Sequence, residues 1–200
     1  MKVGRLARLL GCSMIGAFVV AGVLPARALA QSTHQHNAAQ PGFNSDDRNA
    51  VNAFVQVVRD ATERYKKVSV AQKAGYQLQF GCVSGPDWGA MGMHFVNGAL
   101  VGDGEVDARR PEIVIYEPQP NGSLKVIGAD FLVLADDWNA KHPEGPPQLG
   151  GQLFHLFEAP NRFGLPAFYT LHVWAWKDNP TGTFVNWHSN VSCDNYSGQP

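Results

Sequence analysis

The sequence predicts an α+β domain in which an N-terminal helix packs on a curved, mostly antiparallel β-sheet. An apolar stripe with a period of 3.6 residues runs from about Asp46 to Lys67, and Ser45 before it is a favourable N-cap. Beyond Tyr76 this period gives way to short β-type runs separated by Gly, Pro and Asn. Sheet and loop are therefore expected for the remainder of the chain.

The predicted helix should bury one face against a core. The apolar positions of its stripe are Val51, Phe54, Val55, Val58, Tyr65 and Val68. Asp46 and Asp47 fall in the first turn, where the helix dipole favours negative charge. A short second helix is expected next, because Ser69-Val70-Ala71-Gln72 has a capping-box pattern and Gly75 is a natural stop.

Several strands are expected to follow. Glu112–Glu117 and Leu124–Leu134 form the clearest pair, because an Asn-Gly turn lies between them. Tyr76–Val83, Met93–Val96 and Ala167–Trp176 predict three more strands. Simple alternation along the last one assigns these residues to a single face: Phe168, Thr170, His172, Trp174 and Trp176. Both of its faces are largely apolar, so a central position in the sheet is expected.

The first thirty residues have the order of a secretory signal. Basic residues precede an apolar run from Leu9 to Leu24, which ends near the small-residue pattern Ala28-Leu29-Ala30. The run of about 16 residues is shorter than the roughly 20 of a membrane-spanning helix. We predict a cleavable signal peptide over 1–30, a flexible leader over 31–44 and a single α+β domain over 45–200. The expected location is the periplasm or the exterior of the cell.

The charge pattern argues against a nucleic-acid partner. The chain has 16 Lys and Arg against 17 Asp and Glu, and loss of the predicted signal removes basic residues alone. In the mature chain the adjacent basic pairs are Lys66-Lys67 and Arg109-Arg110, which do not make a clustered basic face. The expected partner is a metal ion or a small molecule, and no transmembrane anchor is expected in the mature form.

Two cysteines, Cys82 and Cys193, remain after removal of the signal. In an oxidising compartment they predict a disulfide, which would stabilise the fold by about 4–5 kcal/mol through the entropy of the unfolded chain. The alternative is a reactive or metal-binding thiolate, which needs a base or a metal nearby.

Three histidines lie inside apolar β-type runs: His94, His155 and His172. A buried imidazole must find hydrogen-bond partners or lose its charge, so three of them in one domain point to a shared site. No compact motif such as His-x-His joins them. Convergence in space is therefore a hypothesis.

A pair of carboxylates accompanies these histidines. Regular hairpin pairing places Glu117 on the same sheet face as Val126 and Asp130. Two histidines and a carboxylate with an open position suit copper, zinc or iron. We predict His94, Glu117 and His172 as metal ligands, with His155 and Asp130 as the fourth ligand or as supporting groups.

Two other functions stay open at this stage. The same His and Glu side chains suit a metal-free enzyme that uses general acid–base chemistry on a small molecule. A small-ligand or carbohydrate-binding module would instead stack its ligand on Trp174 and Trp176. The sequence does not decide whether the protein is an enzyme.

Three blocks of sequence are distinctive: Gly89-Ala90-Met91-Gly92-Met93-His94-Phe95-Val96-Asn97, Pro111-Glu112-Ile113-Val114-Ile115-Tyr116-Glu117-Pro118 and Leu171-His172-Val173-Trp174-Ala175-Trp176-Lys177-Asp178-Asn179-Pro180-Thr181-Gly182. Over most of residues 60–193 the chain resembles a family of secreted bacterial proteins without an assigned function. In that family the blocks recur with a terminal cysteine, so the matching positions are His94, Glu117, His172 and Cys193. Asp130 departs from the Glu expected there, and Trp187-His188 from an expected Asn-Pro after the Trp. The resemblance implies export and a shared site but supplies no reaction.

Overall fold

The computed structural model describes residues 45–198. The predicted signal peptide and leader, residues 1–44, lie outside the described residues, so both remain predictions. The helices are α1 (Ser45–Thr62), the 3-10 helix η1 (Glu63–Lys66), α2 (Val68–Lys73), α3 (Gly98–Val101) and α4 (Ala135–Lys141). No helix among the described residues is both long and apolar enough to cross a membrane.

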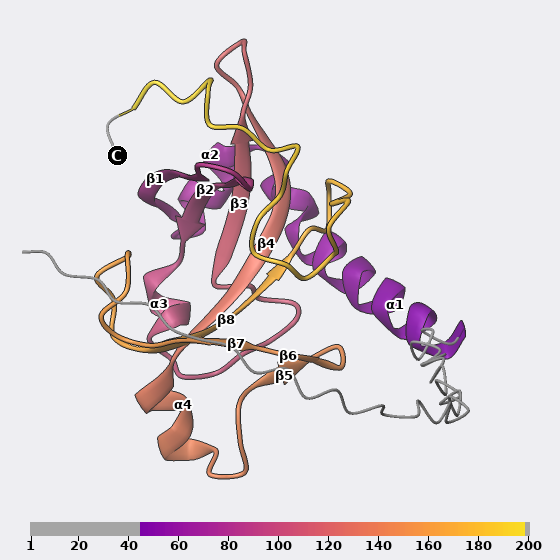
Figure 1. Ribbon diagram of the computed structural model, residues 1–200, viewed down its shortest axis with the longest axis vertical. Helices are drawn as coiled ribbons and strands as arrows, with labels where there is room; N and C mark the ends of the chain where they lie inside the picture. Colours follow the sequence, from indigo (N-terminus) through magenta and orange to yellow (C-terminus); the bar gives the residue numbers. More distant parts are fainter. Residues whose placement is uncertain (1–44, 199–200) are drawn as a thin grey trace, which may run out of the picture. The chain divides into compact units, whose positions relative to one another are not determined.

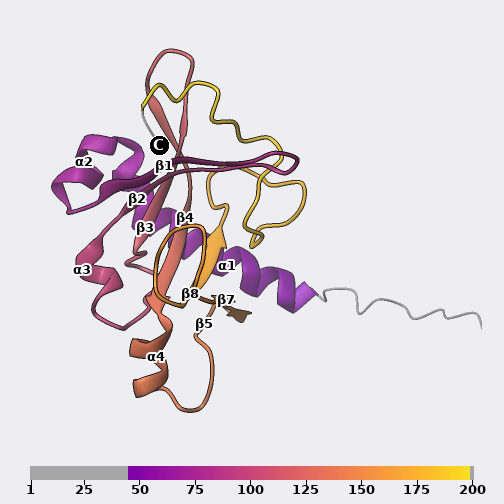
Figure 2. The same cartoon turned by 60° about the vertical axis from the view of Figure 1, so that its left-hand side comes forward.

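Six strands form one antiparallel sheet in the order β1-β2-β3-β4-β8-β7. Their bounds are Gln77–Gly85 (β1), Gly89–Val96 (β2), Ile113–Pro118 (β3), Leu124–Leu134 (β4), His155–Phe157 (β7) and Phe168–Val173 (β8). The sheet curls into a half-barrel, with α1 along one face (Figures 1 and 2). Strands β5 (Gln148–Leu149) and β6 (Gln152–Leu153) form a separate ribbon. The predicted α+β class is confirmed.

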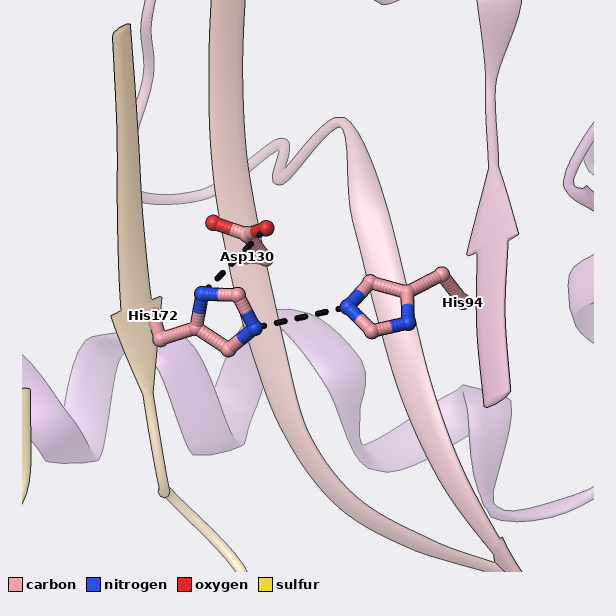
Figure 3. Close-up of side chains that lie close together, drawn as sticks. All are labelled: His94, Asp130 and His172. Carbon is pink, nitrogen blue, oxygen red and sulfur yellow. Dashed lines mark hydrogen bonds and ion pairs between the residues drawn. The ribbon is translucent and has the colours of Figure 1, made fainter. Parts of the chain in front are cut away.

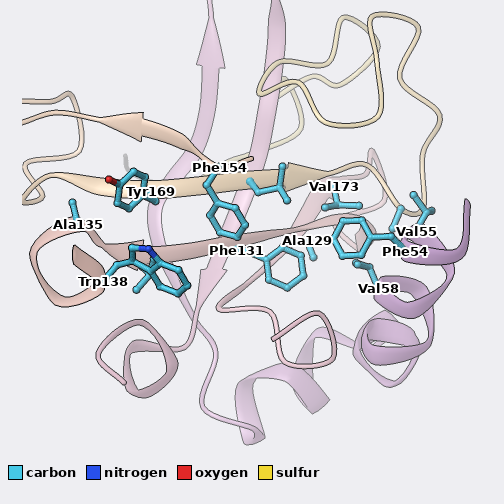
Figure 4. Packing of buried hydrophobic residues seen from close by; sticks show 13 residues of the cluster. Phe54, Val55, Val58, Ala129, Phe131, Ala135, Trp138, Phe154, Tyr169 and Val173 are labelled. Carbon is cyan, nitrogen blue, oxygen red and sulfur yellow. The ribbon is translucent and has the colours of Figure 1, made fainter. Parts of the chain in front are cut away.

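Helix α1 packs on the sheet through the predicted apolar stripe. Phe54, Val55 and Val58 are buried in one cluster with Phe131 of β4 and Val173 of β8 (Figure 4). The helical segment ends in the 3-10 turn of η1, and α2 follows as the expected second helix. Its N-cap is Lys67, without a side-chain capping bond, so the predicted capping box at Ser69 was wrong. The stripe therefore fixes which face of the sheet the helix covers.

The opposite face of the sheet has its own apolar cluster. Ile113 and Ile115 of β3 pack there with Trp174, whereas Val114 and Tyr116 point to the helix-covered side. Each strand thus contributes alternate residues to two separate cores, as expected for a sheet covered on both faces. The face away from α1 carries the buried polar residues described in the next section.

A β-bulge corrects one prediction about side-chain direction. Ile115 pairs with Gly128, but the next residue, Tyr116, pairs with Val126, so β4 carries one extra residue. An extra residue reverses which side the following residues face. Val126 therefore packs with Tyr116 on the helix side, and its predicted place on the face of Glu117 was wrong.

The final strand is shorter than predicted, and this corrects a second assignment. Strand β8 ends at Val173, so alternation does not continue to Trp174 and Trp176. Trp174 packs with the cluster opposite α1, whereas Trp176 packs against the two clusters on the helix side. The prediction that both indoles share one face was wrong, because the chain leaves the regular strand between them.

The predicted disulfide is confirmed. Cys82 in β1 is bonded to Cys193 with a Cα–Cα distance of 5.8 Å, and 111 positions of sequence separate the two residues. The bond attaches the C-terminal segment, which lacks regular secondary structure, to the edge of the sheet.

Candidate metal centre

Three buried side chains meet on the sheet face away from α1. His94 comes from β2, Asp130 from β4 and His172 from β8, and one possible ligand atom of each lies within 4.8 Å of the others (Figure 3). Their exposed fractions are 6%, 3% and 2%. Among residues 45–198 this is the group of histidines and acids that could surround one ion.

The curl of the sheet explains how residues so far apart in sequence converge. Asp130 and His172 are direct cross-strand partners. His94, however, is on β2, and both β3 and β4 lie between it and β8. On a flat sheet three strand spacings would separate the two histidine backbones by about 14 Å. Curling toward this face brings their imidazole rings within contact distance.

Two glycines permit the close backbone packing around the centre. Gly92, with φ of +89°, precedes His94 by two residues, and a Cβ there would lie 2.7 Å from the carbonyl oxygen of Tyr116. Gly128 precedes Asp130 by two residues, and a Cβ there would lie 2.5 Å from the carbonyl oxygen of Val173. Neither position accepts a side chain without movement of the backbone, since both contacts are with backbone atoms.

The contacts inside the centre form a chain. The hydroxyl of Thr170 donates to Oδ1 of Asp130 over 2.5 Å, and Oδ2 of Asp130 lies 3.4 Å from Nδ1 of His172. Nε2 of His172 lies 3.3 Å from Nε2 of His94, whose Nδ1 is 3.2 Å from the carbonyl oxygen of Gly92. The Asp130–His172 contact is not aligned as a hydrogen bond, so Nδ1 of His172 lacks a hydrogen-bond partner among the described residues.

In one tautomeric state, this chain leaves a place for one more positive group between the two imidazoles. The Nδ1 atoms of His94 and His172 each face an oxygen that accepts, the Gly92 carbonyl and the Asp130 carboxylate. If both Nδ1 atoms carry the ring proton, both Nε2 atoms present lone pairs to each other, because a neutral imidazole has one N–H. A proton or a metal cation between the Nε2 atoms removes this repulsion.

Burial disfavours the extra proton. It lowers the pKa of His94 to about 4 and that of His172 to about 3, because a charged imidazole is poorly solvated there. Burial also raises the pKa of Asp130 to about 6. At neutral pH both imidazoles are therefore uncharged and the carboxylate is ionised, which is the protonation state that metal ligands require.

The nitrogen separation also fits a metal ion. Two ligands bound at about 2.0–2.1 Å in tetrahedral geometry lie about 3.3–3.4 Å apart. The Nε2 atoms of His94 and His172 are 3.3 Å apart. A backbone carbonyl and a carboxylate beside the two Nδ1 atoms are the usual partners that hold a ligating histidine with Nε2 toward the metal.

A small cavity adjoins the centre. Its volume is about 30 Å³, and His94, Asp130, Thr170 and His172 supply its polar lining. About 10–15 Å³ of such space holds one water molecule. The centre therefore has room for an ion together with a water molecule or another small ligand.

Two of the predicted ligands lie elsewhere. Both carboxylate oxygens of Glu117 accept from Nζ of Lys177, at 2.7 and 2.8 Å, so this acid forms a salt bridge outside the group. His155 begins the edge strand β7 and is exposed. Asp130, expected as a fourth ligand or support, supplies the carboxylate of the centre in place of Glu117.

The two tryptophans expected to stack a ligand are used in packing. The indole N–H of Trp174 donates to the carbonyl oxygen of Val185 over 2.6 Å, and 3% of Trp174 is exposed. The indole N–H of Trp176 donates to the hydroxyl of Thr62 over 2.9 Å, while Nζ of Lys66 lies 4.2 Å from the ring centre. These placements leave neither indole as an open platform.

Sequence reasoning singled out neither Thr170, which bonds to Asp130, nor the buried acid Glu112, which lies outside the candidate group. Alternation already placed Thr170 on the face of His172, but it did not predict the bond from Thr170 to Asp130. Glu112, buried just before β3, accepts from the backbone N–H of Leu132 over 3.0 Å. The sequence around Glu112 does not predict this bond, because its donor is a backbone group of another strand.

Comparisons with protein-family models, with curated proteins and with solved structures find no match to this chain.

Proposed function

We propose that this protein binds a transition metal ion, copper, zinc or iron, through His94, His172 and Asp130. The observation that supports it most directly is the 3.3 Å separation between the Nε2 atoms of His94 and His172, which are both buried. Imidazole nitrogen together with one carboxylate is a ligand set shared by these three metals. The metal would supply Lewis-acid or redox chemistry, and the protein residues would hold and orient it.

Metal analysis of the purified protein tests this proposal. The mature protein is produced without a histidine tag and measured by inductively coupled plasma mass spectrometry, as isolated and after reconstitution with each metal. We expect about one ion per chain in the wild type and a fall of about tenfold or more in His94→Ala and His172→Ala. No bound metal in the reconstituted wild type contradicts the proposal.

His155→Ala is the matched control for these variants. It removes another histidine from the same part of the sheet, but its side chain is exposed and lies outside the group. We expect it to retain the metal content of the wild type. Equal loss in all three variants would mean that metal is held nonspecifically by histidines.

A metal-free acid–base enzyme is the second candidate. The observation that favours it is the chain from Thr170 through Asp130 and His172 to His94, because a carboxylate that orients an imidazole is the arrangement of a general base. This function would survive exhaustive chelation but would be lost in His94→Ala. The Trp174 and Trp176 module receives less support, since both indoles are engaged in packing.

We also propose that the protein functions in the periplasm or outside the cell, as the resemblance to a secreted family implies. The Cys82–Cys193 disulfide supports this, because such bonds persist in oxidising compartments. N-terminal sequencing of protein recovered from a periplasmic fraction should start at Gln31. Retention of the full N-terminus in the cytoplasm would contradict the proposal.

A further inference from the structure

The cavity beside the candidate metal centre is walled by aromatic rings. Four phenylalanines line it, and they are Phe80, Phe157, Phe163 and Phe168. Their ring centres form a connected series, with 5.4 Å between Phe80 and Phe163, 6.2 Å between Phe163 and Phe168 and 5.2 Å between Phe157 and Phe168. Every polar lining side chain is either one of the three candidate ligands or Thr170, which bonds to one of them.

Phe80 occupies an unusual position at this wall. It lies in an irregularity of β1 between Gln79 and Cys82, and its φ is +63°, followed by Gly81 at +64°. A left-handed conformation is unfavourable for a residue that carries a Cβ atom. Phe80 is 41% exposed, so burial of its ring does not account for the conformation. Bulges next to functional sites commonly redirect a side chain. Here the irregularity directs Phe80 to the cavity.

The chain is anchored immediately after this irregularity. Cys82 is bonded to Cys193, so the segment that carries Phe80 is tied to the C-terminal region. Across the cavity wall, Phe163 belongs to the loop between β7 and β8. The contact between Phe80 and Phe163 therefore joins two segments that the sheet itself does not pair, at the half-exposed end of the cavity.

A positive charge lies outside the aromatic wall. The guanidinium of the exposed Arg162 is 5.8 Å from the ring centre of Phe163 and 5.7 Å from that of Trp187, and Arg162 does not line the cavity. It would attract an anion to the rim. Passing the rings would still require the anion to lose its hydration, which is costly for an ion and cheap for a neutral molecule.

We propose that the candidate metal centre takes a small uncharged molecule as its ligand or substrate, admitted at the aromatic contact between Phe80 and Phe163, which excludes hydrated anions. This proposal rests on the proposed function for the identity of the centre. A volume of about 30 Å³ limits the molecule to a few heavy atoms unless Phe80 moves. Phe80 is thus a specificity-determining residue, and it is not one of the candidate ligands.

Two methionines provide an internal reporter and its control. Met91 lines the cavity, whereas Met93 is buried in the cluster on the helix side of the sheet. Carbon-13 methyl NMR of the zinc-loaded protein can follow both during titration with acetonitrile and, separately, with azide. The two probes are linear with three heavy atoms each, and they differ in charge. We expect acetonitrile to shift the Met91 methyl alone and azide to shift neither methyl.

Opening the aromatic contact should remove the discrimination. In Phe80→Ala we expect the affinity for azide, read from the Met91 shift, to rise about tenfold or more, with Phe80→Leu between this variant and the wild type. Leu156→Ala is the control, because Leu156 is 48% exposed and does not line the cavity. An azide shift of Met91 in the wild type equal to that of acetonitrile would overturn the proposal, as would no Met91 shift with either probe.

The same titration separates failure of this inference from failure of the proposed function. Zinc content is measured on each sample, and the acetonitrile titration is repeated on the metal-free protein. Absence of zinc together with a selective Met91 shift would contradict the metal proposal and support the apolar entry. Full zinc content together with an unselective or absent shift would support the metal site and overturn the entry proposal.

Discussion

Asp130 is held from two sides, and this determines its expected role. Thr170 donates to one carboxylate oxygen, and His172 lies beside the other. A carboxylate so fixed either completes the ligand set or keeps the imidazole of His172 turned with Nε2 toward the ion. In both arrangements its negative charge matters more than its shape.

Asp130→Asn tests that charge. The amide keeps the size of the side chain but removes the charge, so we expect metal affinity to fall about 10- to 100-fold, measured by competition with a calibrated chelator. Asn97→Asp, a change of charge outside the centre, should leave affinity unchanged. Unaltered affinity in Asp130→Asn would show that the carboxylate neither ligates the metal nor orients its ligand.

Glu112, which is not one of the candidate ligands, allows a pH prediction. Burial raises its pKa from 4.5 to about 8, so the folded protein holds a proton that the unfolded chain releases near pH 4.5. Its stabilising contribution is therefore complete below about pH 4.5 and is lost as the pH rises toward and through 8. In the metal-free protein the lowered pKa values of His94 and His172 oppose this decline below about pH 6.5. Urea denaturation should therefore show the decline between about pH 6.5 and 8, where it amounts to about 2 kcal/mol.

Glu112→Gln should flatten that decline. The amide oxygen can still accept from the backbone N–H of Leu132, but the side chain cannot ionise. We expect the free energy of unfolding of the variant to depend less on pH between about 6.5 and 8 than that of the wild type. Identical pH profiles would mean that another group causes the decline.

Individual residues also show how far sequence reasoning reaches. His94 and His172 were predicted ligands because buried imidazoles in apolar strands are costly, and the structure brings them together. Glu117 looked equivalent to Asp130 by alternation, but Lys177, 60 positions away, neutralises it. A partner so distant in sequence leaves no local pattern from which to predict it.

Among the elements, α1 contributes to the packing of one face of the sheet, and it supplies no residue of the candidate centre. The helix buries its apolar stripe on one face, and the candidate centre lies on the other. Phe54 has ring neighbours at 6.2 Å in Phe131 and at 6.0 Å in Phe184. Loss of packing on the helix side should therefore lower stability without removing a ligand.

Phe54→Ala measures this division. We expect a loss of about 3–5 kcal/mol in the free energy of unfolding, measured in urea, because a large buried ring is removed. Metal content below the unfolding transition should equal that of the wild type. Gln56→Ala, an exposed change on the same helix, should stay within about 0.5 kcal/mol.

The periodicity of apolar residues predicted which segments form helices and strands better than it predicted where those segments end. The stripe of α1 and the hairpin of β3 and β4 followed from residue spacing, since each buries a regular face. The bulge in β4 and the end of β8 at Val173 did not follow, because both depend on contacts with neighbouring strands. Those two irregularities account for the wrong placements of Val126 and Trp176.

At the scale of the whole molecule, one covalent bond ties the chain into a loop that contains every strand after β1. The Cys82–Cys193 bond spans 111 positions and includes the three candidate ligands. A crosslink of this length stabilises a fold chiefly by restricting its unfolded chain. The two cysteines could be paired from sequence because they were the pair left after the predicted signal.

Replacing both cysteines tests this contribution. We expect Cys82→Ser with Cys193→Ser to lower the free energy of unfolding by about 2–5 kcal/mol, measured in urea against the oxidised wild type. Reduced wild-type protein should behave like the double variant. Equal stability of all three samples would contradict a stabilising role for the bond.

The distribution of the ligands along the chain has a consequence for how the protein would obtain its ion. His94 and His172 are 78 positions apart, and β3 and β4 lie between their strands in the sheet. A fragment that lacks β8 therefore lacks one of the three candidate ligands. Capture of the proposed ion would then wait until β2, β3, β4 and β8 have come together. Nitrogen and oxygen donors bind Cu²⁺ more tightly than the other divalent first-row metals. Cells therefore select the bound metal partly by controlling which ions are available. If the chain is exported before it folds, as proposed, the metal ions available in the compartment where it folds would determine which metal it binds.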